Sequence, residues 1–373
     1  MKVMTILGTR PEIIRLSRVI GLLDKAAEHV LVHTGQNYDA RLNQLFFDEM
    51  GIRTPDENMA VRASGPAAQI GQILELSEAL FLKHHPERLL VLGDTNSGMA
   101  AIVARRLGIP VYHMEAGNRC YDDRVPEEVN RRVIDHCSTV LMPYTERSRA
   151  NLLREGIAGD RIFVIGNPIK EVIDSFAVEI SSSRALQSLG LQPQGYFLVT
   201  MHRAENVDIE SRLRDLVEAL RQLHLTFERP VICSFHPRTR SKVEAFGVDV
   251  NSPGLRFLEP FGFFDFIRLE QQAFCALSDS GTVQEETCLF HVPNVTIRDV
   301  TERPETVECG SNYLSGTDPN EILRAVRLVT STPARWTPPR EYLAEDVAAT
   351  VCKIVTGYRT PDLAEIAWQQ QSN

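Results

Sequence analysis

The 373-residue sequence lacks the patterns that mark several large classes of protein. It contains no G-x-G-x-x-G fingerprint, no G-x-x-x-x-G-K-[ST] phosphate-binding loop and no G-x-S-x-G nucleophile elbow. Its longest apolar runs, such as residues 196–200, have the length of a β-strand and fall far short of a membrane span. These absences argue against a dinucleotide-fingerprint enzyme, a P-loop enzyme, an α/β-hydrolase and a membrane-spanning protein.

Disulfide and metal patterns are missing as well. The seven cysteines are odd in number and include no C-x-x-C pair, so we expect neither a disulfide framework nor a zinc knuckle. Most of them should be small buried residues. No cluster of His, Asp and Glu has the spacing of a metal site. We therefore expect an enzyme without a metal ion or other cofactor.

An excess of positive charge is also absent. The formal net charge is −9, whereas general nucleic-acid binding needs a basic stripe that neutralises phosphates. A small local basic pocket is compatible with this charge balance. The N-terminus runs straight into a strand-like stretch at 2–7, with no basic n-region and no cleavage site. We expect a cytoplasmic protein with no nucleic-acid or membrane partner.

Strand-like apolar runs alternate with amphipathic stretches along nearly the whole chain, whose length favours two domains. The strands are almost continuously apolar, as in parallel sheets covered by helices on both faces. The expected strands are 2–7, 30–33, 89–92, 111–114, 140–142 and 163–165 in a first set, and 196–200, 231–235, 255–258, 275–278 and 295–297 in a second. The expected helices include 66–83, 97–107, 211–224 and 320–331. The pattern predicts an α/β fold with two Rossmann-like doubly wound domains facing a cleft.

The join between the domains is expected near Gly166-Asn167-Pro168, just after a strand and before a polar stretch. The predicted domains are residues 1–167 and 168–357. A helix expected at 343–358 follows a proline-rich segment, and the tail at 358–373 is long enough to cross back and pack on the first domain. In such sheets ligands bind at the carboxyl ends of the strands, so the loops after strands are where chemistry is expected.

Polar motifs follow three strands of the first set. In residues 8–12, Gly-Thr-Arg-Pro-Glu, the Thr suits a helix N-cap and the Pro suits the first turn. Arg10 beside free N–H groups indicates an anion site, and a capped helix with a surface arginine explains the same residues equally well. Asp94 follows the strand at 89–92, and Glu115 follows the strand at 111–114.

Carboxylates accumulate further along the same half of the chain. Glu127 and Glu128 fall in the first turn of a helix that Pro126 can start, and two acids are more than capping requires when Asp94 and Glu115 lie nearby. Several carboxylates near one cleft suit the removal and return of a proton at carbon. Capping plus salt bridges would explain them as well. The available partners are Arg119, Arg124, Arg131 and Arg132.

The second half carries histidines and hydroxyls after its strands. His202 directly follows the first strand of this half, which makes it a general acid/base candidate, although single histidines are often structural. His236 repeats the strand–His–Pro pattern one unit later. The turn Ser280-Gly281-Thr282 enters a helix and offers N–H groups and hydroxyls to a diphosphate, and Glu286 could reach ribose hydroxyls. Arg303 lies in a later segment that mixes charges with hydroxyls.

Taken in order, these segments resemble the non-hydrolysing UDP-N-acetylglucosamine 2-epimerase family, which has two Rossmann-like domains in the GT-B arrangement. The resemblance covers roughly residues 2–355. Each motif is short, but the ordered set is specific. The matching segments are Gly8-Thr9-Arg10-Pro11-Glu12, Gly93-Asp94-Thr95, Glu115-Ala116-Gly117, Pro126-Glu127-Glu128, His202-Arg203, Asp279-Ser280-Gly281 and Glu302-Arg303-Pro304-Glu305.

The resemblance implies an isomerase that inverts C2 of a UDP-linked N-acetylhexosamine. UDP would leave by anti elimination with loss of the C2 proton, and would add back to the resulting 2-acetamidoglucal. Asp94, Glu115 and Glu127 would be the acid/base carboxylates, and His202 would stabilise the leaving group. The implied substrate-binding residues are Arg10, Arg15, Arg119, His236, Ser280, Gly281, Thr282, Glu286 and Arg303. The family also implies a homodimer formed through helices of the first domain.

Four positions depart from the best-known members. The sequence has Arg15 where Lys is usual, Asn37 where a His tied to a bacterial allosteric UDP-sugar site is usual, Asn118 for Leu and Thr282 for Gly. These features are closer to the branch that acts on UDP-2-acetamido-2,6-dideoxy-L-talose and gives UDP-N-acetyl-L-fucosamine. That activity is one alternative. Another is a GT-B glycosyltransferase or UDP-sugar hydrolase, which would not need the three carboxylates around C2.

Overall fold

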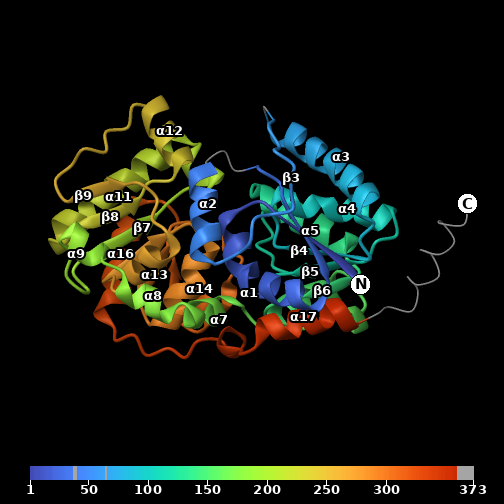
Figure 1. The fold of residues 1–373 in the computed structure, drawn as a ribbon. Helices are drawn as coiled ribbons and strands as arrows, with labels where there is room; N and C mark the ends of the chain where they lie inside the picture. Colours follow the sequence, from blue (N-terminus) through green and yellow to red (C-terminus); the bar gives the residue numbers. More distant parts are fainter. Residues whose placement is uncertain (37–39, 64, 359–373) are drawn as a thin grey trace, which may run out of the picture. The chain divides into compact units, whose positions relative to one another are not determined.

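The chain forms two compact units, each built round its own sheet (Figure 1). The residues that the computed structural model describes are 1–36, 40–63 and 65–358. The first unit contains Met1–Val172 and Leu343–Asn373, and the second contains Ile173–Tyr342. The boundary falls inside helix α7 (Ile169–Ser175) and not at the predicted join at 167/168. The α/β fold with two Rossmann-like domains is confirmed.

The sheet of the first unit has six parallel strands in the order β3-β2-β1-β4-β5-β6. Its strands are β1 (Lys2–Leu7), β2 (Glu28–His33), β3 (Glu57–Asn58), β4 (Arg88–Leu92), β5 (Val111–Met114) and β6 (Val140–Met142). Its helices, besides α7, are α1 (Arg10–Ala26), α2 (Ala40–Glu49), α3 (Pro66–His84), the 3₁₀ turn η1 (Asn96–Met99), α4 (Ala100–Arg106), α5 (Pro126–Cys137), α6 (Glu146–Arg154), the 3₁₀ turn η2 (Gly159–Arg161) and α17 (Val347–Gly357).

The strand predicted at 163–165 is not formed. Phe163 and Ile165 donate backbone hydrogen bonds to Leu141 and Pro143, but only one bridge, between Leu141 and Ile162, joins this segment to the sheet. A short edge segment therefore runs beside β6 without completing a ladder. The two-residue strand β3 was not predicted, because a pair of polar residues carries no apolar run for a sequence pattern to detect.

The strand order creates a switch point beside β1. The chain fills one side of β1 with β2 and β3 and then crosses to the other side to add β4, β5 and β6. Loops that leave the carboxyl ends of β1 and β4 diverge there, and doubly wound sheets bind their ligands at such points. The pairing of Thr5 with Leu90 fixes the register of the two strands, so the loops that start at Gly8 and Gly93 emerge side by side.

Alternate residues of these strands pack against helices on opposite faces. Met4 and Ile6 of β1 lie in a buried cluster with Ile73 of α3, Ala101 of α4 and Ile134 of α5. Helix α1 packs its apolar side against the other face of the sheet, and it also packs against α17 (Figure 1). The near-continuous apolar sequence of the strands follows from this cover on both faces.

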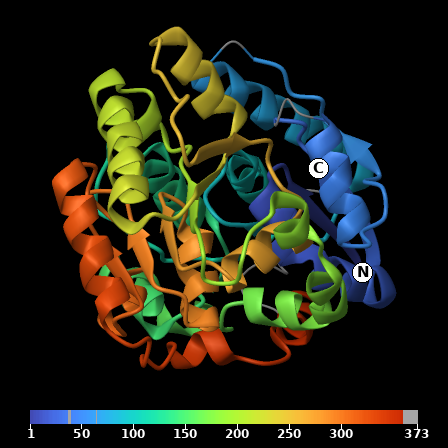
Figure 2. The ribbon, with the colours of Figure 1, turned by 90° about the vertical axis from the view of Figure 1, so that its left-hand side faces the viewer.

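The second unit repeats the same topology. Its strands follow the order β12-β11-β10-β7-β8-β9, which places a second switch point between β7 and β10, and helices lie on both sides of the sheet (Figure 2). The strands are β7 (Phe197–Thr200), β8 (Val231–Ser234), β9 (Leu255–Leu258), β10 (Cys275–Ser278), β11 (Asn294–Thr296) and β12 (Asn312–Leu314). The helices are α8 (Ala177–Ser182), α9 (Ala185–Leu189), α10 (Ala204–Val207), α11 (Glu210–Phe227), α12 (Pro237–Ala245), α13 (Phe263–Gln271), α14 (Gly281–Phe290), α15 (Pro304–Glu308) and α16 (Pro319–Ser331), before the 3₁₀ turn η3 (Arg340–Leu343).

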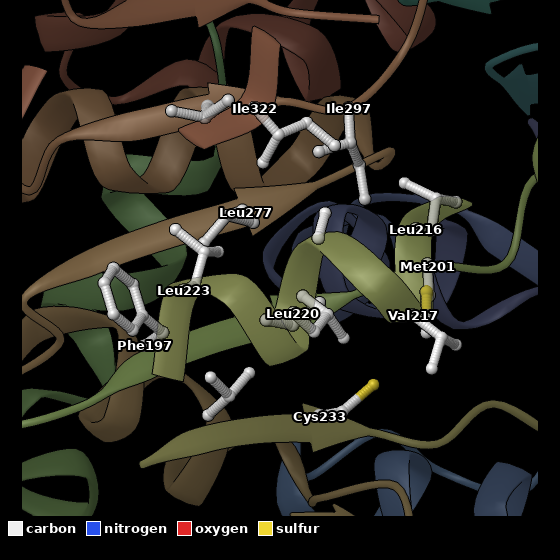
Figure 3. Packing of buried hydrophobic residues seen from close by; sticks show 14 of the residues in the cluster. Phe197, Met201, Leu216, Val217, Leu220, Leu223, Cys233, Leu277, Ile297 and Ile322 are labelled. Atoms are coloured by element: carbon white, nitrogen blue, oxygen red, sulfur yellow. The ribbon is translucent and has the colours of Figure 1, made fainter. Parts of the chain in front are cut away.

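The core of the second unit shows the same alternation. Phe197 of β7 packs with Leu220 of α11 and Ile322 of α16 on one face (Figure 3). The next residue, Leu198, points to the other face and packs with Leu269 of α13. Each strand residue is thus committed to one of two cores, and the strand ends carry the residues that no core needs.

Helix α17 belongs to the first unit, although residues 343–357 were predicted to close the second domain. Its buried side includes Val351 and Val355, and it packs against α1. Arg88 of β4 donates a hydrogen bond to the Val355 carbonyl, and the Tyr112 hydroxyl donates to the Tyr358 carbonyl at 2.7 Å. The C-terminal helix therefore crosses back to the first unit. The predicted tail lies, beyond Tyr358, outside the described residues.

Replacing Val351 by Asp should destabilise the first unit by about 3 kcal/mol or more, because it removes apolar burial and places a charge against α1. Lys353 is exposed on the same helix, and Lys353→Asp should change stability by less than about 0.5 kcal/mol. Denaturant titration followed by hydrogen exchange in peptides of α1 and α11 reports the two units separately. Equal effects of both variants would contradict the assignment of α17.

Candidate functional site

Glu12 is a buried carboxylate that ties together the loops after β1 and β4. Its Oε2 accepts hydrogen bonds from the N–H groups of Gly8 (3.0 Å) and Thr9 (2.7 Å) and from the Thr9 hydroxyl (2.8 Å). Its Oε1 accepts from the Thr95 hydroxyl at 3.1 Å. Burial raises the pKa of Glu12 to about 7, against the opposing effect of these hydrogen bonds. The predicted N-cap at Thr9 is thus one half of a capping box whose glutamate also reaches the next strand end.

The backbone at Gly8 is closely approached from both sides. A Cβ at this position would overlap the Thr34 hydroxyl and lie 2.6 Å from Ser97 Oγ, so only glycine fits between the loops. Arg10 follows at the first position of α1, and its guanidinium carbon lies 5.6 Å from the centroid of the Phe46 ring. The structure thus places this predicted anion-binding residue at the helix start beside the switch point, half-buried.

Asp94 follows β4 and is held by residues of α5. Arg131 donates to Asp94 Oδ2 from Nε at 3.1 Å and from Nη2 at 2.6 Å, and its Nη1 donates to Glu128 Oε2 at 2.8 Å. Asn130 donates to the Asp94 carbonyl at 3.0 Å. The Asp94 side chain keeps 24 % of its surface exposed. It is therefore oriented by its neighbours and still accessible to a ligand.

Glu115 lies beside the β4 loop in a strained backbone conformation. Its φ of +65° is in the left-handed region that non-glycine residues rarely adopt. Arg15 Nη1 donates to its Oε2 at 2.7 Å, and Asn118 Nδ2 donates to its Oε1 at 3.2 Å. A Cβ added at Gly93 would lie 3.8 Å from that Oε2, so the carboxylate reaches back toward the loop that carries Asp94. Arg15, predicted to bind substrate, is 1 % exposed and contacts Glu115.

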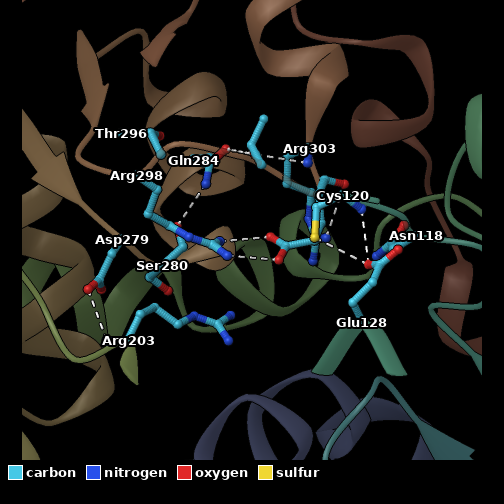
Figure 4. Close-up of polar contacts among 12 residues, drawn as sticks. Asn118, Cys120, Glu128, Arg203, Asp279, Ser280, Gln284, Thr296, Arg298 and Arg303 are labelled. Carbon is cyan, nitrogen blue, oxygen red and sulfur yellow. Dashed lines mark hydrogen bonds and ion pairs between the residues drawn. The ribbon is translucent and has the colours of Figure 1, made fainter. Parts of the chain in front are cut away.

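The two neighbouring glutamates of α5 have different surroundings, which the sequence could not separate. Glu128 is buried and accepts a hydrogen bond from the Cys120 N–H at 3.0 Å (Figure 4) and another from the Tyr121 N–H at 3.0 Å. Burial would raise the pKa of Glu128, but the Cys120 N–H and the charge of Arg131 lower it below its ordinary value. Glu127 lies half-buried in the first turn of the helix. Glu128 therefore holds the loop after β5, whereas Glu127 keeps part of its surface exposed.

Arg119 is in the interior, in contrast to the predicted contact with substrate. Its side chain has no exposed surface, and Nε and Nη2 donate to the two carboxylate oxygens of Glu155 at 2.8 and 2.6 Å. Nη1 donates to the Asn118 carbonyl at 2.7 Å and pairs with Asp135 at 2.8 Å. Despite burial, these hydrogen bonds and charges raise the pKa of Arg119. Arg119 thus holds the loop that follows Glu115.

In the second unit, a buried carboxylate holds the loop after β7. Asp279 accepts hydrogen bonds from the N–H groups of His202 (2.9 Å to Oδ2) and Arg203 (2.9 Å), and the latter is drawn in Figure 4. His202 Nδ1 lies 3.2 Å from Asp279 Oδ1, and its side chain is 28 % exposed. Burial would raise the pKa of Asp279, but the charge and hydrogen bonds of His202 and the backbone N–H of Arg203 lower it to about 2. The carboxylate thereby orients the His202 ring.

The other predicted groups of this unit lie on neighbouring strand ends, because β7 pairs with both β8 and β10. His236 follows β8, its ring centroid is 5.3 Å from that of His202, and its Nδ1 accepts a hydrogen bond from Arg238 N–H at 3.2 Å. Ser280 is the N-cap residue of α14, and its hydroxyl is 2.9 Å from that of Thr282. The N-terminus of this ten-residue helix supplies positive electrostatic potential beside the two rings.

Arg303 and Glu286 are both buried. Arg303 Nε donates a hydrogen bond to Glu285 of α14, and a Cβ at Gly281 would lie 3.6 Å from the Arg303 guanidinium carbon. Arg303 is thus next to the start of α14 and paired with an acid of the same helix. Glu286 follows in the second turn of α14, as predicted for a residue that reaches a nucleotide bound at the helix start.

Several residues that hold these loops were not assigned from the sequence. Glu12, Glu128 and Asp279 belong to the quoted motifs, but the sequence does not show that their side chains are buried. In the sequence, His113 is a polar residue inside an apolar strand. Arg131 and Asp135 look like charged residues on the exposed face of a helix. The contacts that join separate loops, such as Arg131 with Asp94 and His113 with Asp135, connect different elements, so no local spacing identifies them.

Two kinds of feature are absent from residues 1–36, 40–63 and 65–358. No group of three or more His, Cys, Asp or Glu side chains there is arranged to hold a metal ion. None of the helices in these ranges combines the length and the apolar character needed to cross a membrane.

Comparison with known proteins places this arrangement in context. The family model described as UDP-N-acetylglucosamine 2-epimerase matches residues 23–356. A UDP-N-acetylglucosamine 2-epimerase of Methanocaldococcus jannaschii is 39 % identical over 347 residues, which cover 91 % of this chain and 95 % of that protein. The family model covers the strand-end motifs from Asp94 onward and begins after the motif at residues 8–12.

Solved structures agree with the sequence comparison. The structure of UDP-N-acetylglucosamine 2-epimerase from Rickettsia bellii superposes with a TM-score of 0.90 at 40 % identity and covers 100 % of both chains. The Methanocaldococcus jannaschii enzyme in complex with UDP-GlcNAc and UDP gives a TM-score of 0.90 at 36 % identity, over 95 % of this chain and 99 % of that one. A glycosyltransferase of lipopolysaccharide biosynthesis, 13 % identical with a TM-score of 0.60, shares the GT-B fold alone.

Glu12→Gln should remove a pH dependence of stability. The folded-state pKa of about 7 lies above the ordinary 4.5, so the folded state holds the extra proton between these values. The contribution of this carboxyl to stability is therefore present below about pH 4.5 and is lost as the pH rises through 7. Between pH 4.5 and 8 the wild type should lose on the order of 3 kcal/mol that the variant keeps.

The glutamine can preserve the hydrogen bonds, because its oxygen can face Gly8 and Thr9 while its amide donates to the Thr95 hydroxyl. Urea titrations at pH 4.5 and 8 measure the difference. Glu75→Gln, at an exposed position of α3, is the control and should follow the wild type. Parallel pH curves for Glu12→Gln and the wild type would contradict the dominance of burial at Glu12.

Proposed function

The chain belongs to the UDP-N-acetylglucosamine 2-epimerase family, and from this membership we propose that it inverts C2 of UDP-N-acetylglucosamine (UDP-GlcNAc) to give UDP-N-acetylmannosamine (UDP-ManNAc). The activity is an isomerisation. The observation that carries the proposal is the set of carboxylates Asp94, Glu115 and Glu127 at the switch point of the first sheet, in a chain 39 % identical to an epimerase over nearly its whole length. No metal or nicotinamide takes part in the proposed reaction.

The reaction proceeds by elimination and re-addition. The C2–H bond breaks, its electron pair forms a C1=C2 double bond, and the C1–O bond to UDP breaks with the pair leaving on the diphosphate. Inversion then needs a proton delivered to the opposite face of C2, so at least two acid/base groups have to face the sugar. Glu115, held by Arg15 and Asn118, and Asp94, held by Arg131, supply fixed carboxylates for these steps, and Glu127 supplies a third.

The second unit supplies the groups that suit a leaving diphosphate. His202 has its Nδ1 turned to Asp279, which leaves Nε2 to face a phosphate oxygen. The N-terminus of α14 and the hydroxyls of Ser280 and Thr282 add donors of the kind that bind phosphates. Donors fixed in advance stabilise the charge that develops on the leaving group without reorganisation. Glu286, in the same helix, is proposed to bind the ribose.

A second substrate is favoured by one observation. Arg15 and Asn118, two of the positions that depart from the common family pattern, both contact the carboxylate of Glu115. Different partners for Glu115 would orient its carboxylate for a sugar that differs at C5 and C6. UDP-2-acetamido-2,6-dideoxy-L-talose is therefore the second candidate substrate for the same chemistry.

Incubation of the purified protein with UDP-GlcNAc in D₂O, followed by proton NMR, tests the reaction and the substrate together. We expect UDP-ManNAc with deuterium at C2 and no requirement for added metal or NAD. Conversion of the 6-deoxy-L-talo substrate alone would replace the first candidate by the second. Release of free UDP from either substrate without an epimer would contradict the epimerase assignment and indicate a hydrolase.

Glu115→Gln and Glu127→Gln should each lower kcat by about 10²- to 10⁴-fold, because a glutamine cannot transfer the proton. The matched control is Glu146→Gln, since Glu146 occupies the first turn of α6 as Glu127 occupies that of α5 and is exposed. It should leave kcat unchanged. Single-turnover and steady-state assays with the substrate found above measure the effect, and near-normal turnover in both site variants would disprove their acid/base role.

The cytoplasmic location and the homodimer expected from the family resemblance stay predictions for this chain. Light scattering coupled to gel filtration measures the oligomeric state directly. A monomer at the concentrations used for the assay would contradict the predicted dimer and would leave the proposed epimerase reaction unaffected.

A further inference from the structure

A buried histidine lies directly behind the loops that carry two of the proposed acid/base residues. His113 is the third residue of β5, and its side chain has no exposed surface. Its Nε2 lies 2.8 Å from the Gly93 carbonyl oxygen, and its Nδ1 lies 2.9 Å from Asp135 Oδ1. Gly93 immediately precedes Asp94, so the ring contacts the backbone from which that carboxylate extends.

Both neighbours of the ring are oxygen acceptors. A carbonyl oxygen carries no hydrogen, and burial would raise the pKa of Asp135, but the hydrogen bond and charge of His113 and the charge of Arg119 lower it below its ordinary value. Asp135 also accepts from the Gly117 N–H and pairs with Arg119, so it is a carboxylate and the ring donates from both nitrogens. Two donated bonds fix the plane of the ring and both of its partners.

Asp135 extends the same contact to the other loop. Its Oδ2 accepts a hydrogen bond from the Gly117 N–H at 3.1 Å and pairs with Arg119 Nη1 at 2.8 Å. Gly117 lies two residues after Glu115 and has a φ of +80°, and a Cβ there would lie 2.9 Å from the Ser148 carbonyl carbon and clash with that backbone. The Gly117 N–H therefore has one narrow position, which the carboxylate sets.

The charges of this cluster balance, and of its four charged side chains only that of Glu155 is partly exposed. His113 and Arg119 are positive, and Asp135 and Glu155 are negative, with Glu155 bound bidentately by Arg119. His136 is a titratable residue next to this cluster. Its side chain is mostly exposed, and its Nε2 lies 3.6 Å from a carboxylate oxygen of Glu155. A balanced and fully hydrogen-bonded buried network can hold one geometry, whereas a half-satisfied one cannot.

We propose that His113 and Asp135 are positioning residues that fix the loop of Asp94 relative to the loop of Glu115, so that the two carboxylates face the sugar at a set separation. This inference rests on the proposed function. Neither residue contacts the reacting atoms. The ring holds the Gly93 carbonyl on one side, the carboxylate holds the Gly117 N–H on the other, and the bond between them joins the two loops.

Two substitutions separate the two bonds of the ring. The amide nitrogen of Gln can take the place of Nε2, so His113→Gln can keep the bond to Gly93 and loses the one to Asp135. The amide nitrogen of Asn can take the place of Nδ1, so His113→Asn keeps the bond to Asp135 and releases the Gly93 carbonyl. Asp135 retains Gly117 and Arg119 in both variants, which makes His113→Asn the more damaging change for Asp94.

Kinetics with the substrate of the wild-type enzyme provide the first test. His113→Asn should lower kcat on the order of 100-fold with KM within about 2-fold, because the carboxylate is misplaced while the nucleotide groups of the second unit are untouched. His113→Gln should stay within about 5-fold of the wild-type kcat. Equal losses in the two variants, or wild-type kcat in both, would overturn the proposal.

His29 offers a matched control in the same unit. Its ring is also buried, bound to Thr5 Oγ1 at 2.8 Å and to Asp24 at 2.6 Å, but it lies near the amino end of β2, away from the strand ends that carry the site. His29→Asn should lower the unfolding temperature and leave kcat unchanged. A kcat loss for His29→Asn as large as that for His113→Asn would show that general destabilisation explains both, and would overturn the proposal.

Hydrogen exchange by mass spectrometry tests the positioning without any activity. In His113→Asn, amides of residues 93–99 should exchange faster, on the order of 10-fold, while those of α1 keep their wild-type rates. In Asp135→Asn the acceleration should include residues 115–121. Unchanged exchange in both loops would overturn the inference even in an active enzyme. A wild type that is inactive on every UDP-sugar tested would remove the proposed function instead, and would leave this readout intact.

Discussion

A carboxylate taken out of water has to receive hydrogen bonds or opposite charge in return, and the loops of both units are built round such groups. Glu12 collects the N–H groups after β1 and the Thr95 hydroxyl after β4. Asp135 and Glu128 do the same for the loop after β5, and Asp279 does it for the loop after β7. Irregular backbone at a strand end has no ladder to satisfy it, so each buried acid replaces the missing partners and fixes the loop.

This constraint divides the acids of the first unit into two groups. Glu12 and Glu128 each accept from two backbone N–H groups, and Asp135 accepts from one besides His113 and Arg119; all three are buried and define the loops. Asp94 and Glu115 are instead held by side chains, Arg131 on one and Arg15 with Asn118 on the other. Side-chain partners orient a carboxylate and leave part of it open to a ligand, which is the property that an acid/base group requires. The strained φ of Glu115 fits the same division, because strain is tolerated where neighbouring contacts over-determine the conformation.

The two units supply different groups to the proposed reaction. The first offers fixed carboxylates to a carbon atom, and the second offers a histidine, hydroxyls and a helix N-terminus to a diphosphate. Both sets lie at the switch point of a sheet with the same strand order, where the diverging crossovers leave the strand ends uncovered. Two sheets of the same topology thus carry different groups at their strand ends through a few loop residues.

Local patterns in the sequence, namely continuous apolar runs and polar strand ends, are enough to predict the fold class, the two units and the loops that carry the proposed site. Tertiary structure decided what local patterns do not contain. Glu127 and Glu128 are adjacent and chemically identical, and only their partners distinguish them. In the sequence Arg119 looks like an exposed loop arginine, whereas in the fold it is buried and paired with Glu155 and Asp135. Helix α17 reads as the end of the second domain, yet its apolar face fits α1, more than 300 residues earlier in the sequence. The physical reason is the same in each case: burial and charge pairing depend on residues distant in sequence, whose approach is fixed by the packing of whole sheets and helices.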